Sequence, residues 1–167
     1  MEIESLKFKT EKEYKEFLDY LFLIKDIEYR DFNTKIVVPV DCEIIGIRTP
    51  ILRDIAKKIA KTSSENFLNL FEKLFIKKKV KYYEEKVLYG FLIGYSNMDY
   101  QDRLRRIDFF INIIDNWAVC DIVDSSFKFI NKNKEDFYKY LNSKLSATNP
   151  WEQRFIFVML LAYYVED

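Results

Sequence analysis

Trp117, Asp121 and Arg154 are the residues of this chain whose types and spacing point most directly to chemistry. Trp117 and Asp121 lie in the stretch "DNWAVCD" (115–121), four residues apart. On a helix this spacing places the indole and the carboxylate on one face. A helix that only fills a core has no need of that carboxylate. Asp121 therefore either caps or pairs with a neighbouring group, or forms a small site together with Trp117.

Simpler interpretations of the same residues remain open at this point. Trp117 could be a core aromatic side chain, and Asp121 could be paired with a nearby lysine or arginine. Asp115 and Asp124 are competing carboxylates on or near the same helix, and two close carboxylates would raise the pKa of one of them. Cys120 is better read as a small buried residue than as a nucleophile, because no histidine accompanies it.

The amino-acid composition disfavours several classes of function for this chain. The chain of 167 residues has no histidine and only two cysteines, which disfavours zinc, haem and catalytic-triad chemistry and any disulfide framework. Its 27 basic and 27 acidic residues balance, whereas a dedicated nucleic-acid binder usually has a basic excess. The balance still permits one basic face opposite an acidic one.

Nothing in the sequence predicts a membrane span or a leader peptide. The first ten residues, "MEIESLKFKT", lack an apolar segment, and no stretch of 18 apolar residues is free of charge. We therefore expect no membrane contact and a cytoplasmic location.

The elements that must position these side chains are predicted to be helices. Hydrophobic residues make up 49% of the chain, while only three glycines and three prolines interrupt it, which favours long helices and short loops. Apolar residues at helical spacing predict helices at about 10–25, 50–61, 64–75, 81–95, 99–115, 116–131, 134–145 and from 150 onward. The stretch before residue 35 is read as irregular, and "KIVVPVDCEIIG" (35–46) as an extended loop without partner strands.

Two helix starts carry clear signals. Thr49 is a candidate N-cap followed by Pro50 at the first helical position. Asn149 and Pro150 repeat this arrangement, and Glu152 is predicted to complete a capping box.

The helix starts recur at an even interval. Pro50, Tyr83, Trp117 and Pro150 are separated by 33, 34 and 33 residues. A helix-pair repeat of this period predicts an all-α fold, an α-solenoid of HEAT-like antiparallel helix pairs, whereas a simple bundle would not need such regularity. Trp117 and Arg154 are 37 residues apart, about one repeat plus one helical turn, so the three side chains could meet on adjacent helices.

Three segments then resemble a known family. "GIRTPILRDIAKKIAK" (46–61), "DNWAVCD" (115–121) and "WEQRF" (151–155) look like the DNA alkylation repair enzymes of the AlkD type, glycosylases built from HEAT-like repeats. The resemblance covers roughly residue 35 to the carboxyl end, with the segments in the family's order and spacing. It implies that Trp117, Asp121 and Arg154 line a concave DNA-binding cleft and carry catalysis.

The resemblance also implies a substrate and its partners. It indicates excision of cationic N3- or N7-alkylated purines from double-stranded DNA, without a metal or organic cofactor, by a monomer. Arg48, Lys57 and Lys61 are the candidate DNA-backbone contacts, and "KKKVK" (77–81) and "RLRR" (103–106) are further basic clusters. Charge runs of this kind are more often solvated helix faces than binding stripes. The alternative is a HEAT-like scaffold that binds nucleic acid or protein without cleaving a bond.

We read residues 1–167 as a single repeat domain. Its last predicted helix, "WEQRFIFVMLLAYYVED", is strongly apolar, whereas a terminal repeat normally presents a polar outer face. We therefore expect the chain to be shortened at its carboxyl end relative to the family.

Overall fold

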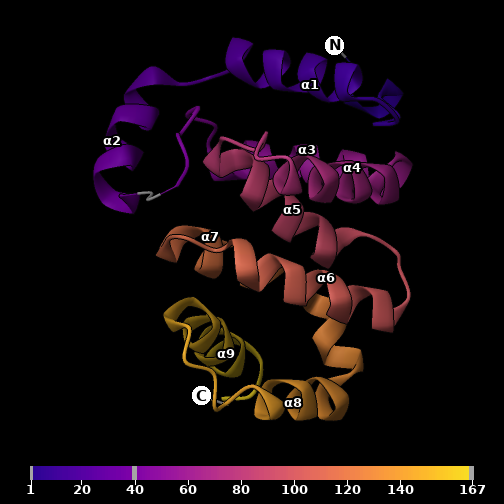
Figure 1. Cartoon of the computed structure of the whole chain (residues 1–167), viewed down its shortest axis with the longest axis vertical. Helices are drawn as coiled ribbons and strands as arrows, with labels where there is room; N and C mark the ends of the chain where they lie inside the picture. Colours follow the sequence, from indigo (N-terminus) through magenta and orange to yellow (C-terminus); the bar gives the residue numbers. More distant parts are fainter. Residues whose placement is uncertain (1, 39–40, 166–167) are drawn as a thin grey trace.

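The computed structural model describes residues 2–38 and 41–165, and within these it is built from helices (Figure 1). The helices are α1 (Glu11–Leu23), α2 (Ile27–Val37), α3 (Thr49–Thr62), α4 (Ser64–Ile76), α5 (Tyr83–Tyr95), α6 (Tyr100–Ile113), α7 (Trp117–Ile122), α8 (Lys134–Ser143) and α9 (Pro150–Tyr163). Short 3-10 turns occur at η1 (Ile3–Ser5), η2 (Asp124–Ser126) and η3 (Lys128–Lys132). No helix of the described part of the chain is long and apolar enough to cross a membrane.

The helix pairs are stacked along the long axis of the molecule, from α1 at one end to α8 and α9 at the other (Figure 1). The odd-numbered helices α3, α5, α7 and α9 contact one another in sequence order. They begin 34, 34 and 33 residues apart, so the predicted repeat is confirmed as a structural one. The structure confirms the all-α helical repeat fold.

The starts of α3 and α9 agree in part with the caps that the sequence predicts. α3 begins at Thr49 with Pro50 in its first turn, although the N-cap position falls on Arg48. At α9 the Asn149 side chain accepts a hydrogen bond from the backbone N–H of Trp151 at 2.9 Å, as an N-cap should. The predicted capping box is wrong, because the carboxylate of Glu152 instead accepts from Lys144 Nζ at 3.3 Å.

The helix predicted over 116–131 is the largest error of the sequence reading. α7 ends at Ile122, and η2 and η3 follow it. The hydroxyl of Ser126 donates to the Val123 carbonyl at 2.6 Å, and Asp124 accepts from the N–H of Ser125, so side chains compete with helical hydrogen bonds. The turn packs on Gly94 of α5, where an added Cβ would lie only 2.5 Å from the Ser126 carbonyl oxygen. Close packing on α5 therefore ends the helix early.

α2 is the second difference from the sequence reading, which assigned no helix between residues 26 and 35. Asp26 caps it by accepting from the Tyr29 N–H at 2.9 Å, and the helix runs on into the segment expected to be extended. From residue 41 that segment is a loop that contains no helix, and Glu43 in it forms an isolated bridge with Tyr82. Residues 39 and 40 lie outside the described residues. α2 lies to one side of the stack, beside the start of α3 (Figure 1).

Candidate functional site

Asp121 and Arg154 form a two-pronged ion pair that joins α7 to α9. Arg154 Nε donates to Asp121 Oδ1 at 2.8 Å, and Nη2 donates to Oδ2 at 2.5 Å. The two side chains are 32% and 43% exposed, so the pair remains accessible from solvent. The hydrogen bonds that Arg154 donates to Asp121, together with the charge of that carboxylate, raise the pKa of Arg154. Sequence spacing suggested that these groups could meet, and they do so as a fork-shaped, charge-assisted contact.

Trp117 lies one helical turn before Asp121 and lines the same cavity. Its ring is 40% exposed, which rules out the core-aromatic interpretation. The indole Nε1 donates to the carbonyl oxygen of Ile36 in the last turn of α2 at 3.2 Å. This bond satisfies one of the carbonyls that a helix end leaves unpaired, so Trp117 ties α7 to α2.

The cavity at this point has a volume of about 280 Å³ and lies between α2, α5 and α7. Its lining comprises Tyr29, Asn33, Val37, Thr49, Tyr83, Trp117, Ala118, Asp121 and Ile122. The α2 side chains among them were missed by the sequence reading. The available signals were Asp26 as an N-cap and Glu28 in the first turn. α2 buries only Asn33 and Val37 and exposes Phe32 and Ile36, so it lacks the amphipathic pattern that reveals a helix.

A buried glutamate on α5 holds the loop that leads from this cavity to α3. Glu84 is fully buried, and its carboxylate accepts from the backbone N–H groups of Ile45, Gly46 and Ile47 at 2.9, 2.7 and 3.2 Å. Burial raises the pKa of Glu84, while these three hydrogen bonds act to lower it. Gly46 has φ +104° and lies against Asp26 and Arg30, a conformation and a closeness that only glycine accommodates.

A buried ion pair positions the start of α7. Lys86 Nζ lies 3.0 Å from Asp115 Oδ2, and the two side chains are 4% and 9% exposed. The same carboxylate accepts from the backbone N–H of Asp41 at 3.0 Å and from Asn116 Nδ2 at 2.8 Å. Asn116 Oδ1 in turn accepts from the N–H of Val119 at 3.0 Å and caps α7. Asp115, one of the competing carboxylates in the sequence, is therefore committed to a structural network.

Asp124, the other competing carboxylate, differs from Asp121 in its surroundings. Burial raises the pKa of Asp124 and the nearby charge of Asp121 adds to the rise, while the Ser125 N–H and Arg53 oppose it. Arg53, which the sequence reading did not single out, donates to the Tyr95 hydroxyl at 3.2 Å and to the Ile122 carbonyl at 3.3 Å. It connects α3 to α5 and to the end of α7.

The predicted DNA contacts occupy both ends of α3. Arg48 pairs with Asp26 at 2.8 Å, and its guanidinium lies over the ring of Tyr29, 5.0 Å from the ring centre. Lys57 and Lys61 line a separate hollow of about 470 Å³ together with Ala60, Tyr95 and Asn97. The structure thus gathers Lys57 and Lys61 in one place and puts Arg48 beside the cavity.

Four residues of the two basic runs make ion pairs within the chain. Lys77 and Lys79 both pair with Glu11, at 3.0 and 2.5 Å. Arg105 and Arg106 pair with Glu72 and Asp102. The interpretation of these runs as solvated helix faces is wrong, because residues 77–81 follow the end of α4 and Arg103 and Arg106 are buried.

The surroundings of both cysteines make their thiols poorly reactive. Burial is the main cause that raises the pKa of Cys42 and of Cys120 to about 12. A thiol with such a pKa is protonated at neutral pH and is a poor nucleophile. This agrees with the reading of Cys120 as a small buried residue.

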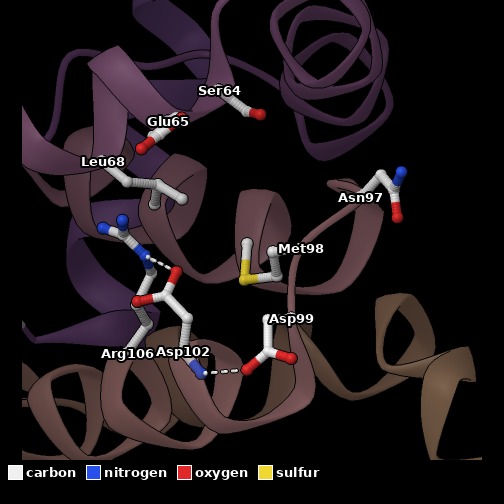
Figure 2. A pocket seen from close by; sticks show the side chains of 8 residues that line it. All are labelled: Ser64, Glu65, Leu68, Asn97, Met98, Asp99, Asp102 and Arg106. Carbon is white, nitrogen blue, oxygen red and sulfur yellow. Dashed lines mark hydrogen bonds and ion pairs between the residues drawn. The ribbon is translucent and has the colours of Figure 1, made fainter.

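A second hollow, about 200 Å³ in volume, lies between α4 and α6 (Figure 2). Figure 2 shows Asp102 joined to Arg106, and Asp99 joined to the start of α6. The carboxylate of Asp99 accepts from the N–H of Gln101 at 2.9 Å, as a helix cap. The carboxylates of Asp99 and Asp102 in this hollow are thus occupied within the fold. In the described residues no cluster suited to a metal ion was found.

Comparison with known proteins gives one match. A family model described as "DNA alkylation repair enzyme" matches residues 10–166, almost the whole chain. No curated protein and no solved structure matches significantly.

Proposed function

The chain belongs to the DNA alkylation repair enzyme family, and from that premise we propose that it is a DNA glycosylase for cationic N3- and N7-alkylated purines in duplex DNA. The observation that carries the proposal is the accessible Asp121–Arg154 pair, one helical turn from a half-exposed tryptophan at the wall of a cavity. A surface ion pair of this kind contributes little to stability, about 0–1 kcal/mol. Its arrangement beside an aromatic ring is therefore better explained by chemistry than by folding.

Asp121 acts on the sugar in this mechanism. A purine alkylated at N3 or N7 is positively charged, so when the bond between C1′ and the base nitrogen breaks, the base takes the electron pair and leaves neutral. Positive charge then develops on the deoxyribose. The carboxylate of Asp121 stabilises that charge and orients a water molecule, whose oxygen forms the new bond to C1′ and whose proton passes to the carboxylate or to solvent.

Trp117 and Arg154 complete the site. The indole face of Trp117 attracts the cationic base or sugar, a contact worth about 0.5–2 kcal/mol. Arg154 uses Nε and Nη2 to hold Asp121, and this bond keeps the carboxylate oriented. Its remaining nitrogen, Nη1, is left to donate one charge-assisted hydrogen bond to a phosphate oxygen of the DNA backbone.

Arg48, Lys57 and Lys61 supply the backbone contacts in this proposal. All three belong to α3 or its N-cap, the helix that stacks next to α5. Lys57 and Lys61 share one hollow, so they would neutralise neighbouring phosphates of one strand. Such contacts give sequence-independent affinity that falls as salt rises.

The test is release of free base from alkylated duplex DNA by the Asp121→Asn variant. We expect the rate of base release to fall by about 10²–10³-fold, as when one preorganised electrostatic group is removed from an active site. Because the lost ion pair is exposed, the unfolding temperature should stay close to that of the wild type. Asp19→Asn is the matched control, since Asp19 also makes an exposed ion pair, with Lys15 at 2.9 Å.

Two outcomes would contradict the proposal. Unchanged base release by Asp121→Asn would remove Asp121 from catalysis. Binding of alkylated duplex by the wild type without any base release would favour the non-catalytic scaffold. A gel-shift assay on the same DNA distinguishes these results.

A further inference from the structure

Arg53 on α3 reaches across α5 to the end of α7. Its Nη1 donates to the hydroxyl of Tyr95 at 3.2 Å, and its Nη2 donates to the carbonyl oxygen of Ile122 at 3.3 Å. The guanidinium also lies over the ring of Phe91, 4.7 Å from the ring centre. Because the donors of a guanidinium lie in one rigid plane, two hydrogen bonds and a stacked face leave the group little freedom to turn.

The surroundings that hold Arg53 are themselves well packed. Phe91 is fully buried, and the half-buried Tyr95 lies one turn further along α5, with the two ring centres 5.9 Å apart. On α3, the neighbouring residue Leu52 is fully buried, and the whole helix packs along α5. Arg53 therefore extends from a fixed support.

The end of α7 is a place where such a contact matters. Ile122 is the last residue of α7, follows Asp121 directly and lines the same cavity. α7 has only six residues, and a helix this short is marginal unless contacts with the rest of the protein hold it. Its last carbonyl groups have no partner within the helix, so the Ile122 oxygen can accept from a side chain. Trp117 and Asn116 fix the start of α7, and Arg53 fixes its end.

We propose that Arg53 is a positioning residue that sets the place of the Asp121 carboxylate relative to the DNA strand bound on α3. The inference rests on the proposed function, in which Asp121 acts on the sugar while Lys57 and Lys61 bind phosphates. Lys57 and Lys61 follow Arg53 by about one and two helical turns, so the three residues share one face of α3. Because α3 is one continuous helix, it joins the phosphate contacts to the support of α7.

Loss of Arg53 should therefore affect the chemical step and not the binding of DNA. Without the hydrogen bond to Ile122, the end of α7 can shift, and Asp121 shifts with it. A misplacement of about 1 Å can cost about 10²-fold in rate. Arg53 contacts no phosphate in this role, so the affinity for DNA and its dependence on salt should not change.

The experiment measures release of 7-methylguanine from a methylated duplex by the full chain with Arg53→Met, in single turnovers at saturating enzyme. Methionine keeps an unbranched stem against Phe91 and removes both hydrogen bonds. Affinity for the same duplex is measured by gel shift at several salt concentrations, and Tm by thermal unfolding. Arg105→Met is the matched control, since Arg105 also joins two helices, through Glu72 and Asp102, and none of these residues lines the cavity.

We expect Arg53→Met to lower the rate constant of base release by about 10- to 100-fold, with the affinity and its salt dependence unchanged. Arg105→Met should keep the rate constant of the wild type. A purely structural role for Arg53 would lower Tm but leave the rate constant at saturating enzyme unchanged, and that result would overturn the inference. A weaker salt dependence in Arg53→Met would show Arg53 to be a phosphate contact and would also overturn it.

Failure of the inference can be told apart from failure of the proposed function. If the wild type releases base and Arg53→Met does so at the same rate constant, the inference falls and the proposed function stands. If the wild type releases no base, the proposed function falls and the inference falls with it. Should Arg53→Met fail to fold, Arg53→Lys is held to the same rate and affinity outcomes, because lysine keeps the charge and the stem but lacks the planar fork.

Discussion

The buried pair between Lys86 and Asp115 offers the sharpest test of how the fold positions Trp117. Replacement of Lys86 by methionine removes the charge but keeps an unbranched side chain of similar length. Asp115 then keeps its hydrogen bonds from the Asp41 N–H and from Asn116, but loses the cation 3.0 Å away. Because both side chains are less than a tenth exposed, water cannot replace the missing partner.

The expected loss of stability follows from this burial. Removal of one partner of a buried ion pair costs about 3–5 kcal/mol. Domains of this kind have only about 5–15 kcal/mol of stability in total. For a chain of this size the loss corresponds to a fall in Tm of roughly 6–20 °C.

The assay compares Lys86→Met with Lys15→Met by thermal and urea unfolding. Lys15 lies 2.9 Å from Asp19, almost the same separation, but the two side chains are 75% and 62% exposed. The exposed pair should contribute only about 0.3–0.5 kcal/mol. Lys86→Met should also shift the fluorescence of Trp117, since Asp115 leads directly into α7. Equal effects of the two variants on stability would refute the argument from burial.

A double variant identifies the source of the loss. Lys86→Met combined with Asp115→Leu leaves no unpaired charge inside the protein, so it should be more stable than Lys86→Met alone. It should remain less stable than the wild type, because the Asp41 N–H and the Asn116 amide lose their acceptor. A double variant no better than Lys86→Met would show that the buried charge is not the cause.

Two further predictions concern packing and reactivity. Gly94→Ala should lower stability by about 1–3 kcal/mol despite the better helix propensity of alanine, because its Cβ would press on the backbone of Ser126; an unchanged Tm would contradict this. Cys42 and Cys120 should react with a thiol reagent at pH 8 only after unfolding. A pKa of about 12 leaves roughly one thiol in 10⁴ as the reactive thiolate at that pH. The rate of labelling of the native chain should therefore rise about tenfold per pH unit. Labelling of either native cysteine at pH 8 at the rate of a free thiol would refute the burial argument.

Local signals in the sequence were sufficient for much of the architecture. Helix caps, prolines and apolar spacing depend on residues a few positions apart, so the starts of α3, α5, α7 and α9 could be read with an error of at most two residues. The same local rule placed Trp117 and Asp121 on one face, where the structure has them line one cavity. The early end of α7 was missed because its cause, the close fit of Ser126 on Gly94, joins residues 32 positions apart.

The sequence by itself determined the class of the fold, the repeat and the identity of three candidate site residues, because each is written in short-range periodicity or in motifs. Only the tertiary structure decided that Arg154 pairs with Asp121 and that the indole of Trp117 donates a hydrogen bond to the Ile36 carbonyl. It also decided that α2 supplies one wall of the cavity. These contacts join residues 33 and 81 positions apart. Their geometry depends on how the helices pack around α5, whose buried Lys86 and Glu84 bind the segments that lead into α7 and α3. No local sequence pattern encodes that packing.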